Sequence, residues 1–196
     1  MTGRVADGPR LTGLDAARAL DAARPDDAAT PVDAVARGGA LAIGALAIGE
    51  VADDEVEAVV ALWRGCGLTR PWNDPYRDVA DARLGSTSTV LVGRANGGAD
   101  PVPDGAPRAG EVVATAMAGL DGHRGWLYYV AVDPRLRGTG LGREMVVAAE
   151  AWLAAQGARK VQLMVRSTNE AAQGFYARLG YADQECTVLG RWLDEA

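Results

Sequence analysis

The chain has 196 residues, of which 48% are hydrophobic, and this length and composition suit one domain with a sizeable core. Its longest apolar stretch, residues 40–49, contains two glycines, whereas a helix that crosses a membrane needs about 20 apolar residues. The amino-terminal residues include no apolar segment typical of a signal peptide, so we expect a cytoplasmic protein without a membrane span.

Cysteine, histidine and charge content narrow the possibilities further. Cys66 and Cys186 lie far apart among apolar neighbours, and His123 is the single histidine, so neither a disulfide framework nor a metal site is expected. The net charge is −6, yet residues 125–180 carry seven basic side chains against four acidic ones. A locally basic segment in an acidic chain suits a small polyanion and argues against general nucleic-acid binding, although scattered solvated charges would give the same count.

The chain divides into an extension and a body. Residues 1–39 have little apolar periodicity and no aromatic side chain, so a loose N-terminal extension is expected there. Residues 40–196 are expected to form one domain. Within it, the glycine- and proline-rich residues 95–110 predict a flexible insertion loop.

Strands and helices alternate in the predicted body. Residues 42–49 predict a short strand, Asp53 can cap a helix that ends near Gly65, and Asp74 followed by Pro75 predicts a second helix. That second helix is expected to reach Leu84. Further strands are expected over residues 86–93, 111–119, 126–132 and 160–166, helices over 141–157 and 169–179, and two last strands within 181–193. Antiparallel pairing in the first part and a strand–helix–strand crossover in the second predict an α+β, three-layer fold. Its mixed, mostly antiparallel sheet would have about six to seven strands, with helices on both faces.

The clearest chemical motif is the glycine-rich sequence after the strand at residues 126–132. There D-P-R-L-R-G-T-G-L-G leads directly into a helix, so Gly138, Gly140 and Gly142 lie where backbone N–H groups and the helix dipole can surround a phosphate. Glycines at a helix start also occur in ordinary turns, so this motif alone leaves both interpretations open.

Two other nucleotide-binding motifs fit these residues less well. A P-loop requires Lys and then Ser or Thr after its last glycine, where this chain has Arg143 and Glu144, so a P-loop is excluded. A Rossmann fingerprint requires G-x-G-x-x-G and an acidic residue about 20 positions later. Here the spacing is G-x-G-x-G and the next strand ends in Arg166, which leaves a dinucleotide enzyme as a weaker alternative.

Taken with a second motif, the glycine sequence resembles the GNAT superfamily of acetyltransferases. The acyl-CoA-binding turn of that superfamily reads Arg or Gln, two residues, Gly, one residue, Gly or Ala, and Arg137, Gly140 and Gly142 match it. Downstream, N-E-A-A-Q-G-F-Y-A-R-L-G-Y at residues 169–181 looks like the other signature, an Asn that opens a helix followed closely by Phe-Tyr.

Two shorter stretches refine this resemblance. C-G-L-T-R-P-W-N-D-P at residues 66–75 and D-G-H-R-G-W at residues 121–126 resemble the small bacterial YpeA-like branch of the superfamily. The resemblance covers roughly residues 41–196 and implies a GNAT-like sheet flanked by helices. It leaves the N-terminal extension and residues 95–110 unmatched.

The resemblance implies acetyl-CoA as co-substrate and assigns roles to particular residues. Tyr176 would act near the thioester sulfur as general acid, because a thiolate leaves more easily when a hydroxyl protonates it or hydrogen-bonds to it. Backbone groups would pair with the pantetheine arm as an added strand would, and the glycine turn would bind the pyrophosphate. The implied donor-binding residues are Val130, Ala131, Val132, Arg137, Gly138, Thr139, Gly140, Leu141, Gly142 and Asn169, with Arg135 and Arg143 adding positive charge. Asn169 as a plain helix cap and Tyr176 as an ordinary half-buried aromatic stay open as alternatives.

The residues on the acceptor side carry a weaker pattern. An amine must lose a proton before it attacks a thioester, and Glu111, Asp121 and His123 are the candidates for a nearby base. Possible pocket walls are Trp72, Asn73 and Asp74. The acidic character of residues 41–124 favours a cationic acceptor such as a polyamine, an aminoglycoside or a lysine side chain.

Three functions therefore remain. The favoured one is N-acetylation of a primary amine of a small molecule or a protein by direct attack. An acyl-enzyme route would need Cys66 as nucleophile, and the apolar surroundings of Cys66 argue against a reactive thiolate. The alternatives are a non-catalytic acyl-CoA-binding sensor or partner module and a dinucleotide enzyme, and a homodimer is left open.

Overall fold

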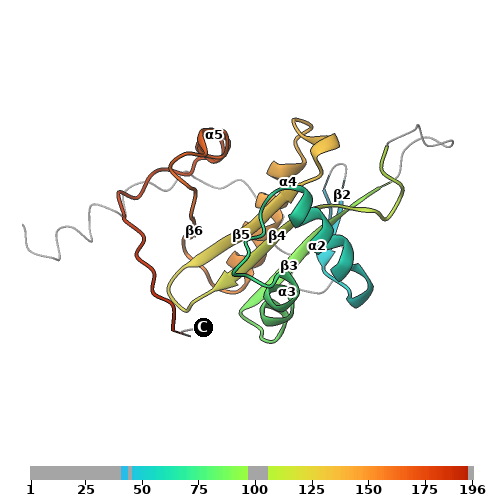
Figure 1. Ribbon diagram of the computed structural model, residues 1–196. Coiled ribbons are helices and arrows are strands. Elements are labelled where there is room, and N and C mark those ends of the chain that lie inside the picture. Colours follow the sequence, from blue (N-terminus) through green and yellow to red (C-terminus); the bar gives the residue numbers. More distant parts are fainter. Residues whose placement is uncertain (1–40, 44–45, 97–105, 194–196) are drawn as a thin grey trace, which may run out of the picture. The chain divides into compact units, whose positions relative to one another are not determined.

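The computed structural model describes residues 41–43, 46–96 and 106–193, all within a unit that spans Val32–Ala196 (Figure 1). The predicted N-terminal extension, residues 1–39, lies outside the described residues. So do residues 97–105 of the predicted insertion loop.

Six strands form one sheet in chain order, β1-β2-β3-β4-β5-β6. Every neighbouring pair is antiparallel except β5 and β6, which are parallel and are joined through a helix. This confirms the predicted crossover. The strands are β1 (Leu41–Ile43), β2 (Leu46–Glu50), β3 (Ser88–Ala95), β4 (Val112–Leu120), β5 (Gly125–Val132) and β6 (Val161–Leu163).

The helices are α2 (Val56–Gly65), α3 (Pro75–Arg83), α4 (Leu141–Ala155) and α5 (Glu170–Arg178), with short 3-10 turns η2 (Asp53–Glu55) and η3 (Pro134–Leu136). The predicted cap of α3 is confirmed, because the Asp74 carboxylate accepts the Tyr76 N–H at 3.0 Å and Pro75 occupies the first turn. Asp53 has a different role from the predicted one. It begins η2, and its carboxylate pairs with Arg83 at 2.5 Å.

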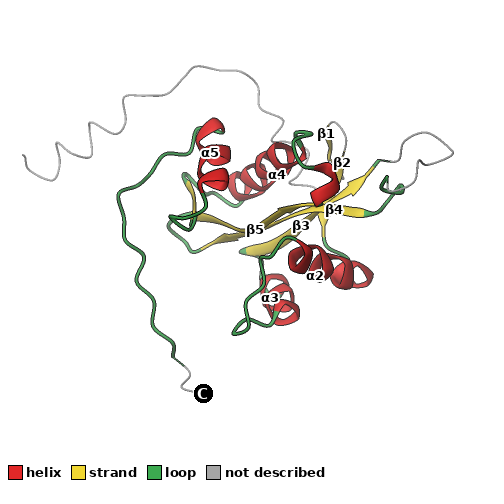
Figure 2. Cartoon of the chain, turned by 45° about the horizontal axis from the view of Figure 1, so that its top comes forward, coloured by secondary structure: helices red, strands yellow, loops and turns green. Residues whose placement is uncertain are grey.

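Helices cover both faces of the sheet, as the sequence predicts (Figure 2). On one face, α4 packs through Met145, Val146 and Leu153 against β4 and β5. On the other face, α2 and α3 pack through buried side chains that include Trp63 and Val79. The sheet is therefore the middle of three layers, and a residue of β5 belongs to one face or the other according to its position in the pleat.

Three predicted strands differ from the structure. The apolar run over residues 42–49 is divided between β1 and β2, which pair with Ile43 opposite Leu46, so one expected strand is in fact two. The prediction of two strands within residues 181–193 was wrong, because that segment contains no strand. Its apolar side chains include Leu189 at 89% and Trp192 at 68% exposure. Strand-like composition alone does not pair a segment, since a strand also needs the edge of another strand.

Among residues 41–43, 46–96 and 106–193, no helix has the length and apolar character needed to cross a membrane.

Candidate active site

The central irregularity of the sheet lies in β5 at Tyr129. Tyr129 has φ +47°, a left-handed conformation that is uncommon for a bulky side chain. In the pairing with β4, Thr115 lies opposite Ala131 and Met117 lies opposite Tyr128, so β5 contains one more residue than β4 between these pairs. This two-against-one count is a β-bulge.

The bulge changes which face each β5 residue belongs to. Leu127 packs in the core beneath α4, and so do Val130 and Val132, whereas Tyr129 and Ala131 pack in the core beneath α2 and α3. Strict alternation from Leu127 would place residues 129 and 131 with it, so the extra residue reverses the alternation. As a result, Tyr128 and Tyr129 line the same pocket on the α3 side.

The bulge also coincides with the point where β5 and β6 separate. Their parallel pairing covers only Gly125 to Leu127 of β5 and ends opposite Leu163. Residues 128–132, here called the open edge of β5, have no strand beside them on the β6 side among the described residues. An unpaired edge of this kind offers backbone N–H and C=O groups to a ligand that pairs as a strand would.

A chain of buried and half-buried contacts holds Tyr129 in its conformation. Its ring stacks on Trp63 with centroids 4.0 Å apart and an angle of 12° between the planes. The Trp63 indole N–H donates to the Thr115 hydroxyl at 2.9 Å, and that hydroxyl donates to the Tyr129 carbonyl at 3.0 Å. At the other end, the Tyr129 hydroxyl donates to the Asp78 carboxylate at 2.6 Å. Burial and the bond to Asp78 raise the pKa of Tyr129.

The glycine turn, residues 137–142, connects β5 and η3 to the start of α4. Gly138 has φ +80° and Gly140, the N-cap of α4, has φ +95°, and a Cβ added at either would meet nothing within 4 Å. The N–H groups of Gly140, Leu141 and Gly142 have no acceptor within the described part of the chain. Free N–H groups at the positive end of a 15-residue helix form an anion-binding arrangement, so these residues fit a pyrophosphate.

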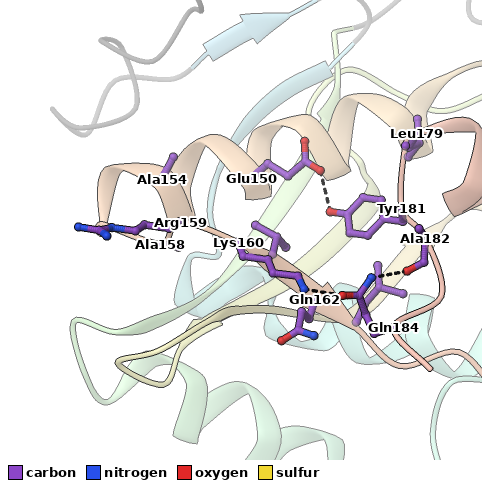
Figure 3. A pocket seen from close by; sticks show the side chains of 13 residues that line it. Glu150, Ala154, Ala158, Arg159, Lys160, Gln162, Leu179, Tyr181, Ala182 and Gln184 are labelled. Carbon is purple, nitrogen blue, oxygen red and sulfur yellow. Dashed lines mark hydrogen bonds between the residues drawn. The ribbon is translucent and has the colours of Figure 1, made fainter. Parts of the chain in front are cut away.

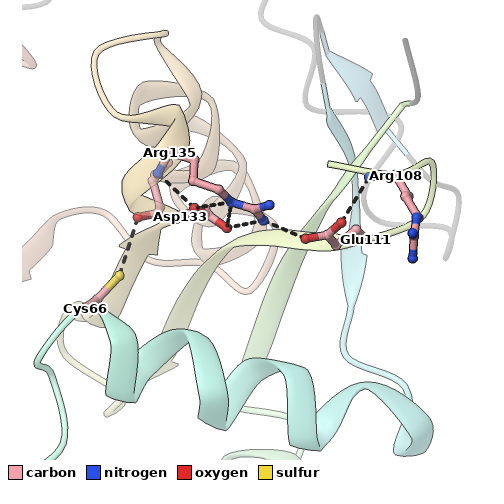
Figure 4. A network of polar contacts seen from close by, with 6 residues as sticks. Cys66, Arg108, Glu111, Asp133 and Arg135 are labelled. Carbon is pink, nitrogen blue, oxygen red and sulfur yellow. Dashed lines mark hydrogen bonds and ion pairs between the residues drawn. The ribbon is translucent and has the colours of Figure 1, made fainter. Parts of the chain in front are cut away.

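An ion-pair network fixes the chain just before this turn (Figure 4). The Arg135 guanidinium bridges Asp133 and Glu111, each at 2.7 Å, and Glu111 also accepts the Arg108 backbone N–H at 2.9 Å. The Cys66 thiol donates to the Val132 carbonyl at 3.4 Å. The Arg135 guanidinium lowers the pKa of Asp133. The pKa of Glu111 is lowered by the Arg108 N–H first and by Arg135 second. Arg135 therefore anchors the turn through two carboxylates.

Helix α5 is held against the start of α4 by aromatic side chains. A Cβ added at Gly142 would lie 3.3 Å from the Phe175 ring and 3.6 Å from Val132, so glycine permits close contact of α5, the turn and β5. Tyr176 contacts Phe175 and Tyr181 edge to face, with centroids 5.0 and 5.6 Å away. The second signature motif is thereby brought to the glycine turn.

Tyr176 and Asn169, the two predicted functional side chains of the second motif, have different surroundings. The Asn169 carbonyl oxygen caps α5 by accepting the Ala172 N–H at 3.1 Å. Tyr176 is half-buried, and burial raises its pKa to about 12. Its hydroxyl is therefore protonated at neutral pH and able to donate.

A pocket of about 400 Å³ opens beside α3 and is here called the α3 pocket. Two carboxylates, Asp78 and Asp81, lie on its helical side, and Tyr128 and Tyr129 lie on its β5 side. Burial raises the pKa of Tyr128, as does the negative charge of Asp121 to a lesser degree. The other lining residues are Asn73, Ala82, Ser88, Met117, Ala118 and Gly119. The pocket is thus acidic and partly aromatic, which suits a cationic group.

The predicted acceptor-side residues lie in three different places. Asn73 lines the α3 pocket, Asp74 caps α3, and Trp72 is 60% exposed and does not line the pocket. Glu111 belongs to the network around Arg135. Asp121 and His123 form the β4–β5 turn.

The Asp121 carboxylate organises that turn. It accepts the N–H groups of His123 and Arg124 at 2.7 and 2.6 Å and the Trp126 indole N–H at 2.8 Å. These bonds, the one from Arg124 first, lower the pKa of Asp121 to about 2. Asp121 is therefore ionised at neutral pH and engaged in three hydrogen bonds.

A larger cavity, about 540 Å³, lies elsewhere, between the second half of α4, β6 and the segment after α5 (Figure 3). Across it, the Tyr181 hydroxyl donates to Glu150 at 2.6 Å, and the Lys160 ammonium group donates to Gln184. None of its lining residues belongs to the glycine turn or to β5. Its position therefore separates it from the predicted donor-binding residues.

Sequence reasoning missed the residues that shape the α3 pocket, namely Asp78, Asp81 and the side chains of Tyr128 and Tyr129. On a helix, Asp78 and Asp81 have the spacing of ordinary solvated acids, so no local pattern distinguishes them. The nearest signal in the sequence was the N-D-P motif at residues 73–75, of which Asn73 lines this pocket. In the part of the chain that the structure describes, no group of three or more His, Cys, Asp or Glu residues could hold a metal ion.

The chain is similar in sequence to proteins of a known family. Residues 57–181 match the model of the Acetyltransferase (GNAT) family. Acetyltransferase ECA0875 of Pectobacterium atrosepticum is 39% identical over 142 residues, which cover 72% of this chain and 92% of that protein.

Solved structures share the fold at low sequence identity. The aminoglycoside N-acetyltransferase AAC(6')-Iy in complex with CoA has a TM-score of 0.61 at 16% identity, covering 79% of this chain and 99% of the other. Glucosamine-6-phosphate N-acetyltransferase from Arabidopsis thaliana has a TM-score of 0.54 at 19% identity, covering 77% and 100%. The predicted α+β fold, a mixed sheet with helices on both faces, is thereby confirmed as GNAT-like.

Proposed function

Because the chain belongs to the GNAT family of acetyltransferases, we propose that it transfers the acetyl group of acetyl-CoA to a primary amine by direct attack. One observation carries this proposal. The open edge of β5 is followed, after η3, by the glycine turn, so a single ligand can pair with the strand and place an anion at the N-terminus of α4.

On the donor side, the glycine turn would bind the pyrophosphate of acetyl-CoA. Backbone groups of Val130, Ala131 and Val132 would pair with the pantetheine amides, and Asn169 would hold the same arm from the start of α5. Arg137 and Arg143 would add positive charge, since no ion pair of either is found within the described residues. Acetyl-CoA supplies the activated thioester, and the chain supplies its orientation.

Tyr176 would assist departure of the thiolate as a hydrogen-bond donor. Its pKa is about 12, whereas an ordinary thiol has a pKa of about 8.5. The proton therefore favours the tyrosine over the thiolate at equilibrium, and Tyr176 stabilises the developing negative charge through a hydrogen bond. The proton that finally reaches the thiolate then derives from the attacking amine.

On the acceptor side, we propose that the amine binds in the α3 pocket. Asp78 and Asp81 give this pocket negative charge, and Tyr128 adds an aromatic face, so a cationic acceptor is favoured. The pocket and the open edge of β5 share Tyr129, which places the amine close to the strand that would carry the thioester. Asn73 contributes to the wall, and the negative charge of Asp121 acts on Tyr128.

Two finer proposals rest on the sequence. The chain is placed in the small bacterial YpeA-like branch on the strength of residues 66–75 and 121–126. Asn73, from the first stretch, lines the α3 pocket, and the negative charge of Asp121, from the second, raises the pKa of Tyr128 in that pocket. A cytoplasmic location is proposed because acetyl-CoA would be the co-substrate.

The test is release of free thiol from acetyl-CoA across a panel of polyamines, aminoglycosides and lysine peptides, with Tyr176→Phe and Tyr181→Phe as matched variants. Each removes one hydroxyl from the same aromatic cluster. Tyr176→Phe is expected to lower kcat about 10²-fold, the effect of losing one donor to developing charge, while Tyr181→Phe retains kcat.

Three outcomes would contradict the proposal. Tight CoA binding without turnover of any amine would identify a non-catalytic CoA-binding module. Thermal stabilisation by NAD or NADP but not by CoA would indicate a dinucleotide enzyme. An unchanged kcat in Tyr176→Phe would remove the role given to that hydroxyl.

A further inference from the structure

We propose that Tyr129 is a positioning residue that keeps the donor-binding edge of β5 open and couples it to the acceptor pocket through Asp78. This inference rests on the proposed function, because it assumes that acetyl-CoA pairs with the open edge. It gives a role to Trp63 and Thr115, and a second role to Asp78 and Tyr129, which line the proposed acceptor pocket.

The backbone at Tyr129 needs an external restraint. A tyrosine with φ +47° lacks the conformational freedom that lets glycine adopt this region, so the left-handed state persists only if its surroundings hold it. Relaxation to the ordinary strand conformation would remove the bulge. Residues 128–132 would then continue the alternation set by Leu127, and β5 would lose the feature that coincides with the end of its pairing with β6.

Three contacts supply that restraint from separate directions. The face of the ring is held by Trp63 at 4.0 Å, and the carbonyl by the Thr115 hydroxyl at 3.0 Å. The far end of the side chain is held by Asp78 at 2.6 Å. Thr115 is fully buried, and its hydroxyl is used on both sides, since it accepts from Trp63 and donates to Tyr129. This use accounts for a polar side chain in the core between α2 and the sheet.

The same contacts link the two substrate sites. The backbone of Tyr129 belongs to the open edge, whereas its ring and hydroxyl line the α3 pocket together with Asp78. A cationic acceptor that binds Asp78 therefore acts on a group that restrains the donor edge. Removing the Tyr129 hydroxyl should consequently change binding at both sites, although that hydroxyl is placed on the acceptor side alone.

The experiment measures the dissociation constant for CoA by calorimetry, and the KM values for acetyl-CoA and acceptor, at a temperature where each variant is folded. Thr115→Val keeps the side-chain volume but removes the hydroxyl, and Thr115→Ser restores it. Val60→Ala is the control. It creates a cavity in the buried core and lowers stability without changing any of the four residues.

Thr115→Val is expected to weaken CoA binding about tenfold, because the Tyr129 carbonyl and the Trp63 N–H both lose their partner. Thr115→Ser should return the affinity to that of the wild type, and Val60→Ala should leave it unchanged. Tyr129→Phe, which keeps the ring and its stack, is expected to raise both the Kd for CoA and the KM for the acceptor about two- to tenfold. This variant tests the proposal if Thr115→Val does not fold.

The possible failures are distinguishable. Wild-type affinity for CoA in both Thr115→Val and Tyr129→Phe would overturn the positioning role and leave the proposed function intact. An equal loss of affinity in Val60→Ala would show that binding follows stability alone, which also overturns the positioning role. A wild-type protein that binds no CoA would overturn the proposed function and this inference together.

Discussion

Replacement of Gly140 by alanine tests the glycine turn, and the other end of the same helix offers a matched control. Gly140 at the start of α4 has φ +95°, and Gly157 just beyond its end has φ +91°. A Cβ at either position would meet no atom within 4 Å, so Gly140→Ala and Gly157→Ala add the same methyl group under the same backbone strain. They differ in location, since only Gly140 belongs to the proposed pyrophosphate site.

The expected loss of stability is similar for the two variants. A left-handed conformation costs an alanine about 1–2 kcal/mol. For a chain of this size, each kcal/mol lowers Tm by about 2–4 °C, so both variants should melt about 2–8 °C below the wild type. Circular dichroism on heating measures this shift.

The expected effect on CoA binding separates the variants. In Gly140→Ala, the added methyl group, or relaxation of the backbone away from positive φ, disturbs N–H groups that would face the pyrophosphate. Loss of one hydrogen bond to a charged group costs about 1.5–3 kcal/mol, and about 1.4 kcal/mol corresponds to tenfold in Kd. Calorimetry should therefore show at least about tenfold weaker binding in Gly140→Ala and wild-type affinity in Gly157→Ala. Equal affinities in the two variants would refute the phosphate-binding role of the turn.

Three further predictions concern packing, the acceptor and acid stability. Gly93→Ala should have a Tm well below that of the wild type, because its Cβ would lie 2.8 Å from Leu46 and 2.9 Å from the sulfur of Met145. Gly85→Ala is the control and should melt near the wild type, because its Cβ would meet only a backbone nitrogen at 4.0 Å. Asp81→Asn should raise the KM for a cationic acceptor several-fold and leave the KM for acetyl-CoA unchanged. Asp54→Asn makes the same charge change outside the α3 pocket and should alter neither KM. An equal rise in the acceptor KM of Asp54→Asn would refute a local effect. The contribution of Asp121 to stability should be complete above about pH 4 and disappear as pH falls through its folded pKa of about 2, because that pKa is lowered from 3.8. The difference in Tm between wild type and Asp121→Asn should accordingly shrink between pH 4 and pH 2, and a difference that is constant with pH would contradict this assignment.

Much of the fold follows from patterns that are local in the sequence. The Asp74–Pro75 cap predicts the start of α3, and the Asn169 cap predicts the start of α5. The glycine turn predicts the start of α4. In each case, the residues that determine the element are within a few positions of it.

The site was less predictable because its decisive contacts join distant segments. Nothing next to Tyr129 in the sequence indicates a positive φ, since that conformation depends on Trp63, Thr115 and Asp78, which belong to three other elements. In the sequence, Asp78 and Asp81 cannot be told from solvated acids, and only their position beside β5 shows that they line a pocket. In the segment after Gly180 the composition predicts strands, but the structure contains none there, because no described strand pairs with this segment.

The bulge in β5 also has a consequence for redesign of this protein. The bulge turns two consecutive tyrosines toward the α3 pocket, and all walls of that pocket are separate in sequence from the glycine turn and from α5. Residues such as Asp81, Ala82 and Met117 can be varied in a library to change the shape and charge of the pocket without altering any residue of the turn. Tyr128, Tyr129 and Asp78 are exceptions and would have to be kept constant, since both tyrosines belong to the pocket and to the open edge of β5, and Asp78 holds Tyr129.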